Sequence, residues 1–97
     1  RVELSDSLKE RLALDVMSLV DEQHHSHAPA WTVPALAARL NLPIAPLERL
    51  AATLITAGYL VETCEEPPQL IAAQDTATVR IADLLDTVRA AGESRIR

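Results

Sequence analysis

The sequence predicts a single, mainly helical domain with one small β-hairpin, and three observations lead to this prediction. The 97 residues are 48% hydrophobic but include no phenylalanine, one tryptophan and one tyrosine, which is typical of a helical core built from aliphatic side chains. Apolar residues recur at three- and four-residue intervals in four segments. Between the third and fourth segments the pattern is that of two short strands. A chain of this length has room for one modest core.

The first helix is expected over residues 6–23. Ser7 and Glu10 have the spacing of a capping box, in which the serine hydroxyl and the glutamate carboxylate satisfy free backbone N–H groups. The apolar stripe that follows consists of Leu8, Leu12, Val16, Leu19 and Val20. Residues 24–30 lose this period and include Pro29, so they are predicted to form a loop.

Two further helices are expected on either side of a tight turn. Thr32 can cap the first of them, and Pro34 falls in its first turn, where a missing N–H costs nothing. Residues 41–43 (Asn-Leu-Pro) end it, and the next helix is expected over residues 44–57. Gly58 then stands where a left-handed residue is needed after a helix. Together these segments predict a helix-turn-helix.

A hairpin and a last helix complete the expected fold. Residues 59–64 and 69–72 favour strands, and the Glu-Glu-Pro-Pro run between them favours a turn. A helical period returns from about Val79 and is expected to stop at Gly92, with an inner face of Ile81, Leu84, Leu85 and Val88. Helix, helix-turn-helix, hairpin and helix is the order of a winged helix.

The whole chain, residues 1–97, is predicted to be one winged-helix domain. We expect an ordered core over about residues 6–91 and a polar tail over residues 92–97. Because the chain starts at Arg1 without an initiator methionine, we expect it to be excised from a longer protein. The longest mainly apolar, uncharged run within it, residues 50–61, is too short for a membrane span, which needs about 20 residues.

Charge argues against nucleic-acid binding by this domain alone. A winged helix commonly places its third helix in the major groove and its hairpin on the phosphate backbone. Residues 32–60 contain only Arg39 and Arg49 as cations, and the expected wing contains Glu62, Glu65 and Glu66, within a chain of formal charge −5. DNA-binding proteins typically neutralise roughly 6–10 phosphates. Residues that would contact a nucleic acid, if any did, are Arg39, Arg49, Thr53 and Thr56.

No catalytic residue can be named from the sequence. The chain lacks a glycine-rich phosphate loop and a nucleophile elbow, and it has two glycines in total. Carboxylate pairs such as Asp83 and Asp86 are expected to lie on a solvated helix face, where their carboxyl groups would not act as an acid/base pair. The segment is therefore predicted not to be an enzyme.

Three histidines, His24, His25 and His27, are weak candidates for metal ligands. Neutral imidazoles are common ligands, and a two-residue offset can let two of them converge. They are expected in a loop with no cysteine nearby in sequence, however, and a tight site needs three or four supported ligands. We therefore predict a solvated polar loop, no bound metal and no cofactor.

Trp31 and Cys64 are expected to have structural roles. Trp31 precedes the Thr32 cap, so it is predicted to pack on the second helix or on the return strand; the alternative is an exposed ring that helps a partner to dock. Cys64 is the single cysteine, which fits a reducing compartment. Its thiol is expected to fill apolar space in a strand, with an exposed thiol as the alternative.

Four stretches of the chain resemble a known family. They run over residues 31–43, 46–50, 57–61 and 81–85, within a likeness that covers about Leu8 to Ala91. Together they resemble the cytoplasmic C-terminal region of the YihY/BrkB inner-membrane proteins, a family also labelled tRNA-processing ribonuclease BN. The resemblance implies a domain on the cytoplasmic side of a bacterial inner membrane, as part of a larger membrane protein. No residue here supplies a metal site, general base or basic RNA track, so the ribonuclease activity is not assigned to this segment.

The same pattern is also similar to iron–sulfur-sensing transcription regulators of the IscR kind. Those proteins hold a cluster through several cysteines and have more basic recognition helices. Here Cys64 stands alone and the expected wing is acidic, so cluster binding is not expected. These differences favour the membrane-protein family.

The leading interpretation is a non-catalytic winged-helix domain that acts in protein contact or regulation. The expected partner is an unidentified protein or the membrane part of the same chain. A weak homodimer is a further alternative. The alternative is a DNA-binding winged helix like those of transcription regulators.

Overall fold

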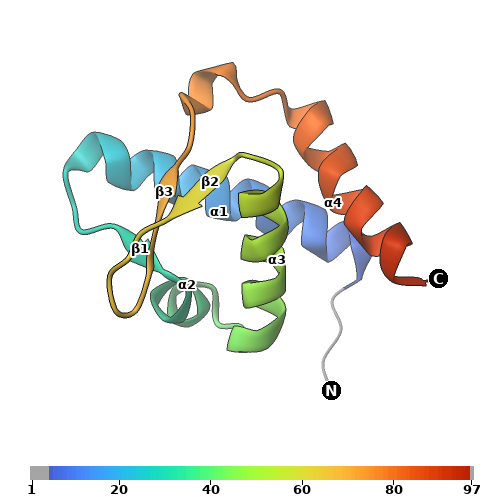
Figure 1. Cartoon of the computed structure of the whole chain (residues 1–97), viewed down its shortest axis with the longest axis horizontal. Helices are drawn as coiled ribbons and strands as arrows, with labels where there is room; N and C mark the ends of the chain where they lie inside the picture. Colours follow the sequence, from blue (N-terminus) through green and yellow to red (C-terminus); the bar gives the residue numbers. More distant parts are fainter. Residues whose placement is uncertain (1–4, 97) are drawn as a thin grey trace.

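The structure is a computed structural model that describes residues 5–96, and it is a winged helix (Figure 1). Its elements are α1 (Asp6–Ser26), β1 (Trp31–Thr32), α2 (Val33–Leu40), α3 (Ile44–Thr56), β2 (Leu60–Glu62), β3 (Gln69–Ala72), the 3₁₀ turn η1 (Thr76–Thr78) and α4 (Ile81–Ile96). The mainly helical architecture with a hairpin, predicted from the sequence, is therefore confirmed. No helix within the described range is long and apolar enough to cross a membrane.

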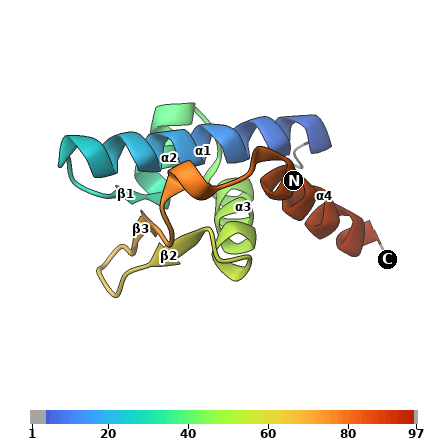
Figure 2. The same cartoon turned by 90° about the horizontal axis from the view of Figure 1, so that it is seen from above.

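One aliphatic core joins the elements. α1 runs along one side of the molecule and contacts α4 and β3, while α3 packs against α2, α4 and β2 (Figure 2). Six elements each contribute at least one fully buried side chain to this core: Val16, Val20, Leu36, Leu47, Leu54, Leu60, Leu70 and Leu84. Because no polar or charged residue in the described chain is buried, the free energy of folding comes mainly from apolar burial.

Helix α1 differs from its prediction at both ends. The hydroxyl of Ser5, and not that of Ser7, accepts the capping hydrogen bond, from the Leu8 N–H at 3.3 Å. Asp6 then lies in the first turn, where a carboxylate is favoured by the helix dipole. At the other end the helix continues through Ser26 to a left-handed His27, so His24 and His25 are helical. Neither imidazole interrupts the helix, which ends only at the left-handed His27, two residues before Pro29.

The helix-turn-helix forms as predicted, because its signals are local. The Thr32 hydroxyl accepts a hydrogen bond from the Ala35 N–H at 3.2 Å and caps α2. Asn41 ends α2 in the left-handed region at φ 57°. Gly58 follows α3 at φ +89°, a conformation that residues with a Cβ rarely adopt. These two residues turn the chain twice within a short span and fix the direction of α3.

The sheet has a third strand that the sequence did not predict. Its order is β1-β3-β2, and Trp31 of β1 lies opposite Leu70 of β3 in an antiparallel pair. The hairpin pairs Leu60 with Ala72 and Val61 with Ile71. A two-residue strand is too short to show a period in the sequence. β1 can therefore be recognised only from its pairing with β3 in the folded chain.

Trp31 is half-buried and packs against the core. Its indole Nε1 donates a hydrogen bond to the carbonyl oxygen of Leu19 in α1, at 3.1 Å. The ring therefore connects β1 to α1, whereas the sequence predicted that it packs on the second helix or on the return strand.

We expect Trp31→Phe to lower the free energy of unfolding by roughly 1–2 kcal/mol, because it removes one hydrogen bond and part of a packed ring. Urea unfolding followed by far-UV circular dichroism measures this change without relying on tryptophan fluorescence. An unchanged midpoint would show that the ring contributes little to the fold and would favour the docking alternative.

Helix α4 begins at Ile81 and continues through Ile96, past the predicted stop at Gly92. The expected tail over residues 92–97 is thus helical as far as Ile96, and Arg97 lies outside the described residues. A glycine inside a helix costs only about 1 kcal/mol relative to alanine, so it does not by itself end one. Ile81 is 61% exposed instead of buried, whereas Leu84 and Val88 pack in the core as predicted.

Candidate interaction surface at helix α3 and the wing

Helix α3 has a buried face and an exposed face. Leu47, Leu50 and Leu54 lie in the core at spacings of three and four residues. The exposed side chains lie on the other face and are Ile44, Ala45, Glu48, Ala52 and Thr56. The side chains on this face are apolar, apart from the carboxylate of Glu48 and the hydroxyl of Thr56.

The four residues predicted to meet a nucleic acid do not form a common surface of free polar groups. Arg39 and Thr56 are exposed. Arg49 is half-buried. Thr53 is also half-buried, and its hydroxyl donates to the backbone carbonyl of Arg49 at 3.1 Å, one turn back along the helix. Thr53 is therefore satisfied by its own helix.

The wing is acidic and its backbone is ordered by one threonine. The Thr63 hydroxyl accepts hydrogen bonds from the N–H groups of Glu65 at 3.3 Å and Gln69 at 3.0 Å. Glu62 and Glu66 are exposed, as is Glu65. The side chain of Cys64 is exposed too, so its predicted apolar filling role is wrong: β2 ends at Glu62, and the cysteine falls in the loop.

A hollow of about 510 Å³ lies between α3, the start of α2 and the wing. We call it the α3–wing groove; its lining residues are Val33, Pro34, Glu48, Ala51, Ala52, Ile55, Thr56, Glu62, Glu66, Pro67 and Pro68. The groove is apolar with three carboxylates, which come from α3, β2 and the loop after it. Each glutamate is visible in the sequence, but their common position depends on how the wing folds beside α3.

The charge of the helix-turn-helix and wing is negative. Residues 31–72 contain two arginines, Arg39 and Arg49, against the four glutamates Glu48, Glu62, Glu65 and Glu66, a net charge of −2. Every one of these four glutamates is exposed. The potential over the surface therefore favours cations over phosphates.

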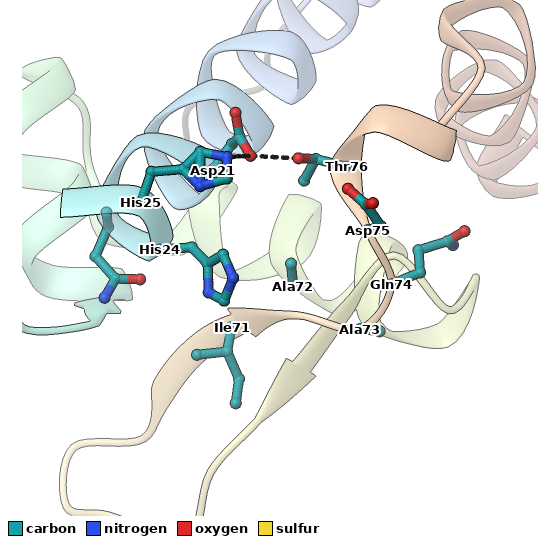
Figure 3. A pocket seen from close by; sticks show the side chains of 10 residues that line it. Asp21, His24, His25, Ile71, Ala72, Ala73, Gln74, Asp75 and Thr76 are labelled. Atoms are coloured by element: carbon teal, nitrogen blue, oxygen red, sulfur yellow. Dashed lines mark hydrogen bonds and ion pairs between the residues drawn. The ribbon is translucent and has the colours of Figure 1, made fainter. Parts of the chain in front are cut away.

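The histidines lie at a different place, at the end of α1, and they do not assemble into a metal site (Figure 3). His25 Nε2 is 3.4 Å from Asp21 Oδ1, and the Thr76 hydroxyl donates to the same carboxylate oxygen. The His24 ring lies 5.5 Å from that of His25, centre to centre. Residues 5–96 contain no group of three His, Cys, Asp or Glu side chains placed to hold a metal ion.

Asp83 and Asp86 of α4 are exposed to solvent, as the sequence predicts. Asp86 lies 3.4 Å from Arg89 in an ion pair. The Arg89 guanidinium also makes two hydrogen bonds with Glu10 of α1, at 3.0 and 3.1 Å. Arg89 therefore joins α4 to α1 through Glu10, whereas its pair with Asp86 lies within α4.

Comparison with known proteins identifies the fold. No family model matches the chain, and no curated protein does. Among solved structures, the chain is similar to CymR (YrzC), the global cysteine regulator of B. subtilis, with a TM-score of 0.74, 18% identity and coverage of 91% of this chain. It is also similar to T. potens IscR, with a TM-score of 0.72, 19% identity and coverage of 89% of this chain. The chain spans 65% of the CymR chain and 60% of the IscR chain. At these identities the likeness shows the fold, and this chain has the winged-helix fold of the two regulators.

Proposed function

We propose that this domain is a non-catalytic winged-helix module that contacts a protein partner through the α3–wing groove and its rim. The observation that carries the proposal is the sign of the charge there: α3 and the wing carry four exposed glutamates, whereas α3 offers one half-buried arginine. A surface with apolar floor and acidic rim suits a protein ligand, because a protein can present apolar and cationic groups together.

Counting phosphate contacts supports this choice over DNA. A protein that binds duplex through Lys and Arg gains affinity by releasing counterions, and typical complexes engage roughly 6–10 phosphates. The α3–wing surface has Arg39 and Arg49 for this purpose. Docking α3 in a major groove would also bring Glu62 and Glu66 towards the phosphate backbone. Repulsion there outweighs what two arginines can contribute.

We further propose that the domain belongs to an inner-membrane protein and lies on its cytoplasmic side. The support is the resemblance of residues 31–43, 46–50, 57–61 and 81–85 to the YihY/BrkB proteins. The gene sequence before the codon for Arg1 tests this proposal: several segments of about 20 mainly apolar residues are expected. A gene without such segments would remove the membrane part of the proposal and leave the protein-contact part in place.

DNA binding is the second candidate, and the fold comparison favours it. The domain resembles the two regulators, CymR and IscR, in the arrangement of its helix-turn-helix and wing. In this chain, Arg39 and Arg49 would have to hold the phosphates. Fold alone does not determine function, so the two candidates are separated by measurement.

We expect duplex DNA to leave the backbone NMR resonances of α3 and the wing unchanged at about 50 mM salt, a condition that strongly favours phosphate binding. Shifts confined to α3 and the wing would support the DNA candidate. If they also vanished with added salt and with Arg39→Ala, the protein-contact proposal would be overturned. Incubation of the same sample with RNA and magnesium, manganese or zinc tests its non-catalytic character, and no cleavage is expected.

A further inference from the structure

We infer that the α3–wing groove binds a cationic protein segment with an apolar anchor residue, such as a Lys/Arg-rich segment carrying a leucine. This inference rests on the proposed function and names the chemistry of the partner. The groove has the two features that such a ligand needs, an apolar floor and separated negative charges at the edge.

The floor is formed by side chains that are already placed by the fold. Ala51 is buried and Ile55 is half-buried on α3, and Pro67 and Pro68 form the opposite wall. Neither proline has a backbone N–H. A chain bound against this wall would therefore bury no unpaired hydrogen-bond donor at these two residues. The volume of about 510 Å³ lies within the range of about 300–1,000 Å³ found for small-molecule pockets, so the open groove has room for one anchoring side chain.

The rim carries three carboxylates that come from three separate segments. Glu48 comes from α3, Glu62 from β2 and Glu66 from the loop after β2. Among residues 5–96 no basic side chain forms an ion pair with any of the three. All three are exposed, so their charges are available to a ligand that approaches from solvent.

Charge complementarity selects this occupant over others. A phosphate backbone would meet three carboxylates, and a second copy of this chain has a formal charge of −5 of its own. Cytoplasmic loops of inner-membrane proteins have an excess of Lys and Arg, so they have the composition that the groove complements. The inference commits to a segment of that kind.

The probe is a short amidated peptide of alternating lysine and leucine, titrated into the labelled domain and followed by NMR. We expect shifts of the Ala52, Ile55 and Glu62 amides and a loss of affinity of roughly three- to tenfold in Glu48→Gln/Glu62→Gln, as two solvent-exposed charge pairs would give. The matched control, Glu22→Gln/Asp83→Asn, removes two exposed carboxylates on α1 and α4 and should bind as the wild type does. A lysine-only peptide without leucine should bind more weakly, because it cannot fill the floor.

Three results would overturn the inference. One is the absence of shifts at the groove with the lysine–leucine peptide, and another is equal affinity in the two double variants. The third is tighter binding of a matched glutamate–leucine peptide, which would leave protein contact standing and reject only the cationic partner. Shifts at α3 and the wing with duplex DNA that vanish with added salt and with Arg39→Ala would instead reject the proposed function itself.

Discussion

The variant Glu48→Lys/Ala52→Lys/Glu62→Lys is expected to bind duplex DNA at least about tenfold more tightly than the wild type at low salt. All three positions line the α3–wing groove and are exposed or at its edge, so the fold should tolerate them. If each lysine meets one phosphate, the plot of log affinity against log salt should steepen by about 2 to 3. Fluorescence anisotropy of a labelled duplex over a range of salt concentrations measures both quantities.

A matched variant separates surface position from net charge. Glu22→Lys/Ala82→Lys/Asp83→Lys changes the charge of the chain by the same amount, at exposed positions of α1 and α4. It should gain much less affinity for DNA than the groove variant. Equal gains in the two variants would show that overall charge governs binding, and the electrostatic argument for the α3–wing groove would be wrong.

The second large effect concerns the anchoring of α3. Leu54 lies on the face of α3 opposite the groove and is 0% exposed. Leu54→Ala is expected to lower the free energy of unfolding by roughly 2–5 kcal/mol, because it removes buried apolar surface and leaves a cavity. For a small domain this is a large part of the total stability. Urea unfolding monitored by circular dichroism gives the change.

A residue on the same helix provides the control. Ile44 is 46% exposed at the start of α3, so Ile44→Ala should change the stability by less than about 0.5 kcal/mol. If Leu54→Ala cost no more than Ile44→Ala, α3 would not be anchored in the core, and the groove would not be a preformed surface.

These variants test the two faces of one helix. Leu54 holds α3 against the other helices, and Glu48 and Ala52 face the wing across the groove. The helix therefore presents a fixed surface whose chemistry can be altered without loss of fold. Because the buried and exposed faces of α3 can be changed independently, the charge of the exposed face can be tested as the feature that selects the partner.

The sequence by itself determined most of the local structure. The Thr32 cap, the left-handed Gly58 and the bounds of α2 were predictable because each depends on interactions within one helical turn or one tight turn. The sparse cations near α3 were predictable too, since charge composition does not depend on packing. The winged-helix order followed from these elements.

Tertiary structure decided the features that depend on distant segments. Strand β1 exists because β3 lies beside Trp31, and the exposure of Ile81 depends on where α4 meets α1 and α3. The end of α1 at Ser26 was also missed: the exposed residues 24–26 show no apolar period, but the helix continues until the left-handed His27. Glu48 and the wing glutamates became neighbours only when β2 and its loop folded back beside α3. Local signals report backbone preference over a few residues, whereas a groove is formed by segments far apart in the chain, so its shape and charge could be read only from the folded domain.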